Sequence, residues 1–189
     1  MIAGILLAAG ASRRFGSQKL LVRVDGRPLV RVTVERLLET ALDDIVIVLG
    51  SDATAVGKAL AGLDVRLVTN AEYASGMSTS LRAGLAALPP SAEAALVALA
   101  DQPGMGREIV DRLLAYYRAS RTPIIAPVYR GNVRGNPVLF DRSVFDELRG
   151  VTGDEGGRSI IARDPGRVAF VEFDVEMPRD IDVPGDIGK

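Results

Sequence analysis

The chain has 189 residues, of which 48% are hydrophobic and 25% charged, and its formal net charge is −1. This composition is typical of one soluble globular domain with a full core, and it gives no basic surface for nucleic acid. No apolar run approaches the ~20 residues that cross a bilayer, and the apolar N-terminus lacks a basic leader. We therefore expect a cytoplasmic protein that binds neither nucleic acid nor membrane.

Histidine and cysteine are both absent from the sequence. Their absence excludes a Ser-His-Asp triad, a histidine general base, disulfides and zinc sites built on either residue. Any chemistry must use carboxylates, cations, hydroxyls and backbone donors, a set that is compatible with a hard metal such as Mg²⁺.

The first predicted element is a strand over residues 2–9, whose continuous apolar run is typical of a strand buried on both faces of a parallel sheet. The loop that follows starts with the small residues Gly10, Ala11 and Ser12 and continues to Arg13, Arg14, Gly16 and Lys19. Small residues let backbone N–H groups approach an anion, and the cations can balance phosphate charges. The pattern predicts a triphosphate-binding loop; the alternative is an ordinary connection with solvated arginines.

Two better-known phosphate loops do not fit this stretch. Walker A requires lysine directly after its second glycine, whereas Lys19 comes three residues after Gly16. The dinucleotide fingerprint requires Gly-x-Gly, whereas Ser12 stands at the second glycine position.

Strands and helices alternate through the next hundred residues. Further strands are expected at 44–50, 65–68, 94–100 and 123–129, and helices at 28–41, 52–60, 78–88 and 108–117. This alternation predicts a three-layer α/β fold with a mostly parallel sheet.

The regular alternation of strands and helices ends after Tyr129. Two glycine-rich loops, 130–137 and 151–158, alternate with a short strand at 138–140, a helix at 159–162 and a strand at 168–173. We find no linker or repeat. The prediction is therefore a single domain over 1–189, with a nucleotide-binding part at 1–129 and a smaller C-terminal lobe at 130–189.

Polar residues follow three of the predicted strands: the loop from Gly10 to Lys19, then Asn70, then Asp101. Ligands of open α/β sheets bind beyond the carboxyl ends of the strands, so one crevice is expected to gather all three. Asp101 is a candidate ligand for Mg²⁺ on the phosphates; the alternative is a simple turn residue, because Asp-x-Pro-Gly is good turn chemistry.

The sequence resembles the molybdenum cofactor nucleotidyltransferases and related nucleotide-sugar enzymes. Leu7-Ala8-Ala9-Gly10, with Ser12, Arg14, Gly16 and Lys19, is similar to their signature loop. The other matching segments follow in the same order: 70–84, 100–103, 135–140, 153–158 and 180–184. The resemblance implies a Rossmann-like nucleotidyltransferase fold with a small C-terminal substrate lobe.

The branch that looks closest is the molybdenum cofactor cytidylyltransferases. Ala9 stands where the guanylyl-transferring branch usually has glycine, which favours CTP over GTP. Three features depart from the family pattern: Asn136 replaces a common histidine, Val183 replaces threonine, and the helix that often follows the last motif is absent. The first departure concerns the acceptor more than the nucleotide.

The resemblance also implies roles for individual residues. Arg14, Lys19 and Asp101 would be catalytic, Mg²⁺ would bind Asp101 and Asp182 with Asp180 in reserve, and Asn136, Asp154 and Arg158 would bind the acceptor. Asp154 has a second interpretation, as the cap of the following helix. The nucleotide would contact Leu7, Ala8, Ala9, Gly10, Ala11, Ser12, Arg14, Lys19, Asn70, Ser78, Ser80 and Asp101.

The implied reaction transfers CMP from CTP to the terminal phosphate of a pterin cofactor, molybdopterin or its molybdenum form, and releases pyrophosphate. Such a phosphate is largely a dianion at neutral pH and needs no general base, which agrees with the absence of histidine. A sugar or polyol phosphate acceptor is one alternative. Another is a non-catalytic escort that carries the pterin cofactor to a molybdoenzyme or its chaperone. A dehydrogenase is disfavoured by the missing dinucleotide glycines.

Overall fold

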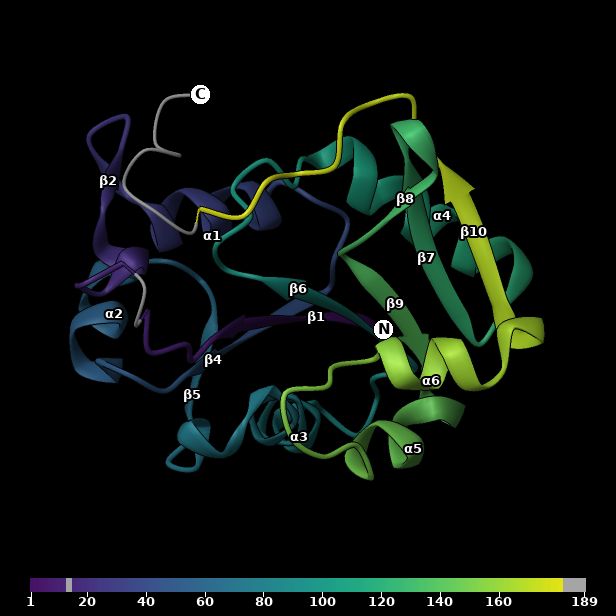
Figure 1. Ribbon diagram of the computed structural model, residues 1–189, viewed down its shortest axis with the longest axis horizontal. Coiled ribbons are helices and arrows are strands. Elements are labelled where there is room, and N and C mark those ends of the chain that lie inside the picture. Colours follow the sequence, from purple (N-terminus) through teal and green to yellow (C-terminus); the bar gives the residue numbers. More distant parts are fainter. Residues whose placement is uncertain (13–14, 182–189) are drawn as a thin grey trace.

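A twisted sheet forms the middle of three layers in the computed structural model, which describes residues 1–12 and 15–181 (Figure 1). Its strand order is β10-β7-β9-β6-β1-β4-β5, with β8 paired to β7. β8 and β9 run antiparallel to their neighbours and the other pairings are parallel. The strands are β1 (Ile2–Ala8), β4 (Asp44–Leu49), β5 (Arg66–Thr69), β6 (Ala94–Leu99), β7 (Ile124–Tyr129), β8 (Val133–Arg134), β9 (Val138–Asp141) and β10 (Val168–Glu172).

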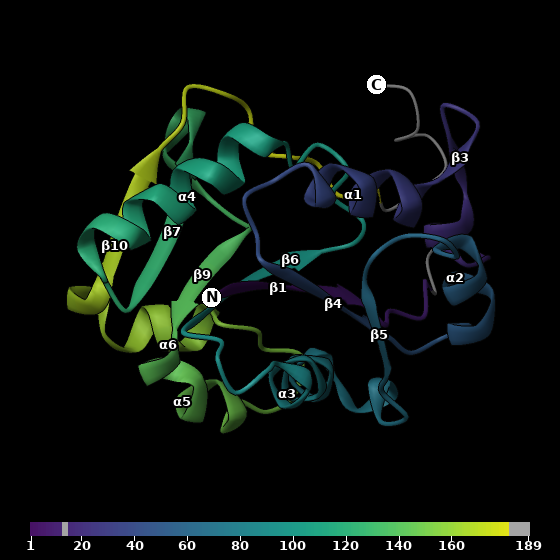
Figure 2. The same ribbon diagram turned by 180° about the vertical axis from the view of Figure 1, so that it is seen from behind.

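Helices cover both faces of the sheet, as Figures 1 and 2 show from opposite sides. On one face lie α1 (Leu29–Leu38), α2 (Ala53–Ala59) and α4 (Arg107–Ser120), and on the other lie α3 (Met77–Ala87), α5 (Phe145–Arg149) and α6 (Arg158–Arg163). Successive strand residues point to opposite faces. Thus Leu6 joins the first core and its neighbour Ile5 joins the second, and both are fully buried.

The predicted three-layer α/β fold with a mostly parallel sheet is confirmed, and each strand and helix expected from periodicity is present within a few residues. The features that were not predicted include the hairpin of β2 (Arg23–Val24) and β3 (Arg27–Pro28), the strand β8 within the loop 130–137, the helix α5, and the insertion of β9 between β6 and β7. Five-residue α5 is too short to show a helical period. Because of β9 and β10, the residues after 129 share the sheet with the rest of the chain.

None of the helices within residues 1–12 and 15–181 is long and apolar enough to cross a membrane.

Helix α3 packs closely on the sheet at Gly84. A Cβ atom at this position would lie 2.5 Å from Ile5 Cγ2 and 3.2 Å from Val48 Cγ2. At Gly57 in α2, by contrast, the nearest side-chain atoms, from Leu49 and Leu67, are both 3.6 Å away, which is ordinary contact. The two glycines therefore occupy helices for different reasons, since only Gly84 is required by close approach.

The two positions make a matched pair of helical Gly→Ala substitutions. We expect Gly84→Ala to lower the free energy of unfolding by about 1–3 kcal/mol, because β-branched side chains beneath it must shift. We expect Gly57→Ala to raise it by up to about 1 kcal/mol, because alanine is the better helix former. Urea denaturation of both variants measures the difference; equal shifts of the same sign would contradict this account of α3.

Candidate active site

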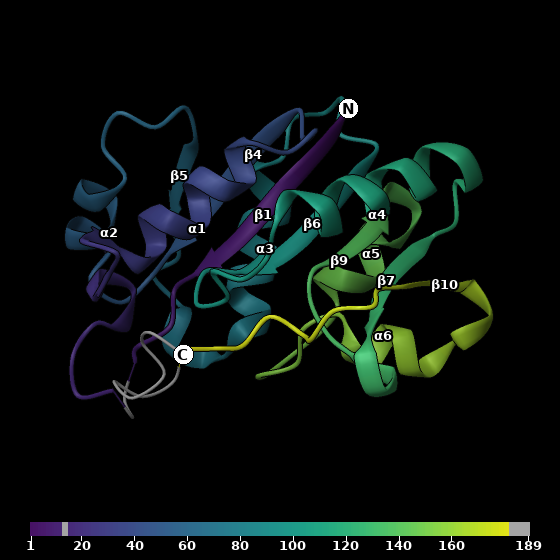
Figure 3. The same cartoon turned by 90° about the horizontal axis from the view of Figure 1, so that it is seen from above.

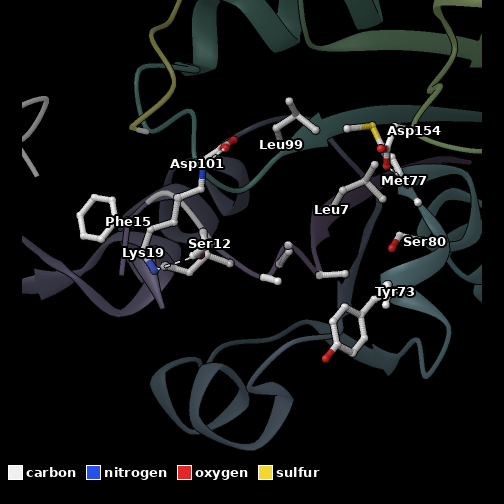
Figure 4. A pocket seen from close by; sticks show the side chains of 17 residues that line it. Leu7, Ser12, Phe15, Lys19, Tyr73, Met77, Ser80, Leu99, Asp101 and Asp154 are labelled. Carbon is white, nitrogen blue, oxygen red and sulfur yellow. Dashed lines mark hydrogen bonds and ion pairs between the residues drawn. The ribbon is translucent and has the colours of Figure 1, made fainter. Parts of the chain in front are cut away.

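A cavity of about 470 Å³ opens at the carboxyl ends of β1 and β6, beside the N-terminus of α3 (Figure 4). Its walls come from the loop after β1, the turn after β6, the start of α3 and the loop before α6. The lining residues are Leu7, Ala8, Ala9, Gly10, Ala11, Ser12, Phe15, Lys19, Leu20, Tyr73, Ala74, Gly76, Met77, Ser80, Leu99, Asp101 and Asp154.

The parallel pairing of β1 with β6 determines this arrangement. Leu7 lies opposite Leu99 in the register, so the two strands end side by side. Their following loops emerge at the same edge of the sheet, which is where open α/β sheets bind ligands. The predicted gathering of the first loop and Asp101 in one crevice follows from this register.

The loop after β1 is held by Gln18, which was not predicted. Gln18 Oε1 accepts a hydrogen bond from Ser12 Oγ at 2.9 Å, and its Nε2 donates to the Ser51 carbonyl at 3.2 Å. Ser12 Oγ in turn accepts from the backbone N–H of Lys19 at 3.1 Å. Within the described residues, no carbonyl or side chain takes the N–H of Gly10 or Ala11. The loop therefore presents a fixed backbone to the cavity.

Lys19 and Asp101 form an ion pair across the cavity. Lys19 Nζ lies 2.6 Å from Asp101 Oδ2, and the two side chains are 15% and 19% exposed (Figure 4). A cation and a carboxylate that are partly shielded from water attract more strongly than an exposed pair. Lysine also suits phosphate and a carboxylate suits a divalent metal, so both groups match charges that a metal–nucleotide complex would bring.

The described residues fit a divalent cation in part. Asp101 offers carboxylate oxygens, the ligand type that Mg²⁺ and Mn²⁺ prefer. Among residues 1–12 and 15–181, no three acidic, histidine or cysteine side chains are placed so that they could hold a metal ion together. The other predicted ligand, Asp182, lies outside the described residues, as does Arg14. One carboxylate suits a cation that keeps waters and takes its other ligands from phosphates.

Asn70 is buried behind the cavity wall and is not among its lining residues. Its Nδ2 donates to Thr79 Oγ1 at 2.8 Å and to Ser80 Oγ at 3.0 Å, and its Oδ1 accepts from the Glu72 N–H at 2.9 Å. Asn70 thus fixes the hydroxyl of Ser80, which does line the cavity. Ser78 is also buried behind the wall, and its backbone N–H donates to the Gly153 carbonyl at 3.0 Å.

The loop before α6 closes the cavity at the start of α3. Asp154 lines the cavity, and its Oδ1 accepts from the Met77 N–H at 3.3 Å. Gly76, with φ of +111°, allows the close approach, because a Cβ there would lie 2.4 Å from the Gly153 oxygen. Asp154 therefore caps α3. The alternative interpretation, a cap of the helix that follows it, is wrong, because Gly157 occupies that position.

The other two predicted acceptor residues do not line the cavity. The carbonyl of Asn136 accepts a hydrogen bond from the Tyr129 hydroxyl at 2.5 Å. Burial raises the pKa of Tyr129 far above its ordinary value, so this hydroxyl stays a protonated donor. Arg158 is exposed as the first residue of α6.

Several lining residues were missed by sequence reasoning, namely Phe15, Leu20, Tyr73, Ala74, Gly76 and Leu99. Apolar residues such as these are indistinguishable from core residues in a sequence. Met77, which lies within the matching segment 70–84, is 38% exposed and also lines the cavity. A large apolar residue directly after a glycine, at the start of a helix beside polar loops, is the signal that indicates this position.

Comparison with known proteins decides the family. Residues 4–168 match the model described as the MobA-like NTP transferase domain. The chain belongs to this family. It is accordingly a nucleotidyltransferase, as the resemblance implied.

Two curated relatives carry different names. The chain is 37% identical to nicotine blue oxidoreductase of Paenarthrobacter nicotinovorans in an alignment of 191 positions, which covers 96% of this chain and 92% of that protein. It is 33% identical over 129 residues to a probable molybdenum cofactor guanylyltransferase of Thermococcus gammatolerans, covering 66% of this chain and 61% of that protein.

Solved structures agree with the fold. The crystal structure of Rv0371c from Mycobacterium tuberculosis H37Rv superposes with a TM-score of 0.88 at 29% identity, over 98% of this chain and 94% of that one. The same protein has also been solved in complex with manganese, with a TM-score of 0.85 at 29% identity and coverage of 98% and 95%.

The hydrogen bonds of Asn70 predict that it supports the site without touching the ligand. Asn70→Ala would leave the Ser80 hydroxyl and the Glu72 N–H without their partner and would remove one of the bonds of the Thr79 hydroxyl, so we expect the free energy of unfolding to fall by about 1–3 kcal/mol. Denaturant unfolding measures this loss. Ser80→Ala, which removes one acceptor at the wall, is the comparison and should cost less. A stability of Asn70→Ala equal to that of the wild type would contradict this role.

Proposed function

We propose that the protein transfers CMP from CTP to the terminal phosphate of molybdopterin or its molybdenum form, in an Mg²⁺-dependent reaction that releases pyrophosphate. The observation that carries the proposal is the juxtaposition of Lys19 and Asp101 across a cavity lined by the backbone of the signature loop. Membership of the MobA-like family supports it, because a nucleotidyltransferase needs a triphosphate cradle and a metal carboxylate together.

The chemistry requires positioning of anions more than proton transfer. An oxygen of the acceptor phosphate forms a bond to the α-phosphorus of CTP, and the bond from that phosphorus to the bridging oxygen breaks. Pyrophosphate leaves with the electron pair. The acceptor is already a dianion at neutral pH, so no general base is needed. The task of the protein is to hold two anionic substrates together and to neutralise their charge.

In this proposal the cationic residues hold the phosphates and the carboxylates hold the metal ion. Lys19, with Arg14, is proposed to hold the β- and γ-phosphates and then the departing pyrophosphate. Asp101, with Asp182, is proposed to hold the cation, which when bound supplies positive charge at the phosphate oxygens. The backbone from Leu7 to Ser12 is proposed to cradle the triphosphate.

Binding of the metal–nucleotide complex would exchange the partners of the ion pair. In the structure Lys19 and Asp101 neutralise each other at 2.6 Å. A triphosphate offers Lys19 a more highly charged anion, and a divalent ion offers Asp101 a more highly charged cation. The charges are thus balanced in both states, so neither group is left buried without a counter-charge.

The two ends of the cavity suit different parts of the substrates. Ser80, which Asn70 positions, is proposed to serve the base and ribose, whereas the predicted contact Ser78 is buried behind the wall. Ala9, in place of the glycine common in the guanylyl-transferring branch, favours CTP. On the acceptor side Asp154 lines the cavity, whereas Asn136 and Arg158 belong to the proposed acceptor part, 130–189, without lining it.

Two other activities have specific support. A sugar or polyol phosphate acceptor is supported by Asn136, which replaces the common histidine. An oxidoreductase is supported by the 37% identity, along nearly the full chain, to nicotine blue oxidoreductase. The loop Gly10-Ala11-Ser12 lacks the glycines of a dinucleotide fingerprint, which favours the transferase. An escort for the pterin cofactor would bind the acceptor without consuming CTP.

The decisive assay measures pyrophosphate release. CTP, GTP, ATP and UTP are each supplied with Mg²⁺ and with molybdopterin or a panel of sugar and polyol phosphates. The proposal expects release with CTP and the pterin cofactor. Release with another pair would correct the substrates, and no release with any pair would overturn the proposed transfer. Oxidation of a nicotinamide cofactor in the absence of any nucleoside triphosphate would establish an oxidoreductase.

Lys19→Met and Asp101→Asn test the two central residues. Each is expected to lower kcat about 10²–10³-fold, because each removes a charge that the transition state needs. Each substitution also leaves one partly shielded charge without its partner, so we expect the melting temperature to fall somewhat while the protein stays folded at the assay temperature. Lys58→Met and Asp25→Asn make the same changes at exposed positions and should leave turnover unchanged. Unfolding in place of inactivity would show that the pair is structural.

A further inference from the structure

A segment after β10 connects the far edge of the sheet to the turn after β6, which carries Asp101. We call residues 174–181 the C-terminal strap. Figure 3 shows it crossing from β10 toward the loop that follows β6. Its outer end is fixed to the residue after β7: the Arg130 N–H donates to the Val175 carbonyl at 3.0 Å, and the Arg130 side chain pairs with Asp174 at 3.0 Å.

The middle of the strap packs against glycines. A Cβ at Gly135 would lie 2.5 Å from Met177 Sδ, and a Cβ at Gly104 would lie 3.4 Å from the Pro178 ring. Pro178 is buried. The strap therefore follows a defined course over the carboxyl edge of the sheet.

The inner end of the strap is fixed to the turn that carries Asp101. The Ile181 N–H donates to the Asp101 carbonyl at 3.0 Å, and the Ile181 side chain is 6% exposed. Beside this bond, Gln102 Nε2 donates to Asp180 Oδ1 at 2.5 Å. The next residue in the sequence, Asp182, lies outside the described residues.

Gln102 is an unusual residue for this buried position. It is 3% exposed, and its Oε1 is buried without a hydrogen-bond partner among the described residues. A buried amide with an unsatisfied oxygen costs free energy that an apolar residue would avoid. Packing therefore does not explain Gln102, and its bond to the strap does.

We propose that Gln102 is a positioning residue of the metal site. By holding Asp180 it keeps the strap on the turn, so that the backbone that carries the Asp101 carboxylate stays fixed. The strap and the turn come from distant parts of the chain, and the bond from Gln102 to Asp180 ties them together beside the bond from the Ile181 N–H to the Asp101 carbonyl. This inference rests on the proposed metal-dependent function, and it assigns Gln102 no contact with substrate.

Gln102→Met is the most direct test, because methionine fills nearly the same volume and donates no hydrogen bond. Two measurements apply. Amide hydrogen exchange by NMR should be at least about tenfold faster at Ile181. The concentration of Mn²⁺ that half-saturates the protein, measured by the electron paramagnetic resonance of free Mn²⁺ with α,β-methylene CTP present, should rise about tenfold, as for other partners of metal ligands.

Two further variants complete the test. Gln102→Glu places a carboxylate beside Asp180 and should give the same two effects, which keeps the test open if the methionine variant does not fold. Arg130→Met removes exposed ion pairs at the outer end of the strap and should change neither Ile181 exchange nor the Mn²⁺ requirement. The free energy of unfolding, measured in parallel, separates local loosening from global instability.

Unchanged Ile181 exchange or an unchanged Mn²⁺ requirement in the Gln102 variants would overturn the inference. Failure of the proposed function has a different signature, because it is seen in the unsubstituted protein as absence of Mn²⁺ binding and of pyrophosphate release.

Discussion

The parallel pairing of β1 with β6 is the constraint on which the site depends. It brings together Lys19 and Asp101, which are 82 residues apart in the sequence, at 2.6 Å. The apolar runs of the two strands are buried on both faces, so a shift in their register would expose core residues as well as separate the pair. Stability of the sheet and geometry of the site are therefore enforced by the same contacts.

The site also shows how a chain without histidine or cysteine can be equipped for group transfer. Its chemical groups are a lysine, carboxylates, serine hydroxyls and a backbone loop held by Gln18. Groups of these kinds are suited to binding and neutralising anions. A reaction whose nucleophile is already ionised is suited to such a set. One relative that is 37% identical to this chain is named an oxidoreductase. A shared fold therefore does not by itself determine which reaction a protein catalyses.

Most of the fold could be predicted from the sequence, because long apolar runs and helical periods record burial directly. The order of strands could not be predicted: β9, residues 138–141, looks like any short strand, and its antiparallel place between β6 and β7 depends on long-range packing.

The cavity loop and Asp101 were predicted from their position after strands. Asn70 shows the limit of that reasoning. A polar residue after a strand can face the cavity itself or, as the bonds of Asn70 to Thr79 and Ser80 show, support a neighbour that lines it. The bond of Gln102 could not be predicted, because its partner Asp180 lies far along the chain. The bonds of Gln18 to Ser12 and Ser51 could not be predicted either, because they depend on the path that the loop takes.

A crystal structure with α,β-methylene CTP and Mn²⁺ tests the central claim most directly. The account predicts anomalous scattering from manganese at the Asp101 carboxylate, the triphosphate along the loop from Leu7 to Ser12, and Lys19 turned from Asp101 toward the phosphates. A triphosphate bound elsewhere, with the Lys19–Asp101 ion pair intact, would contradict it.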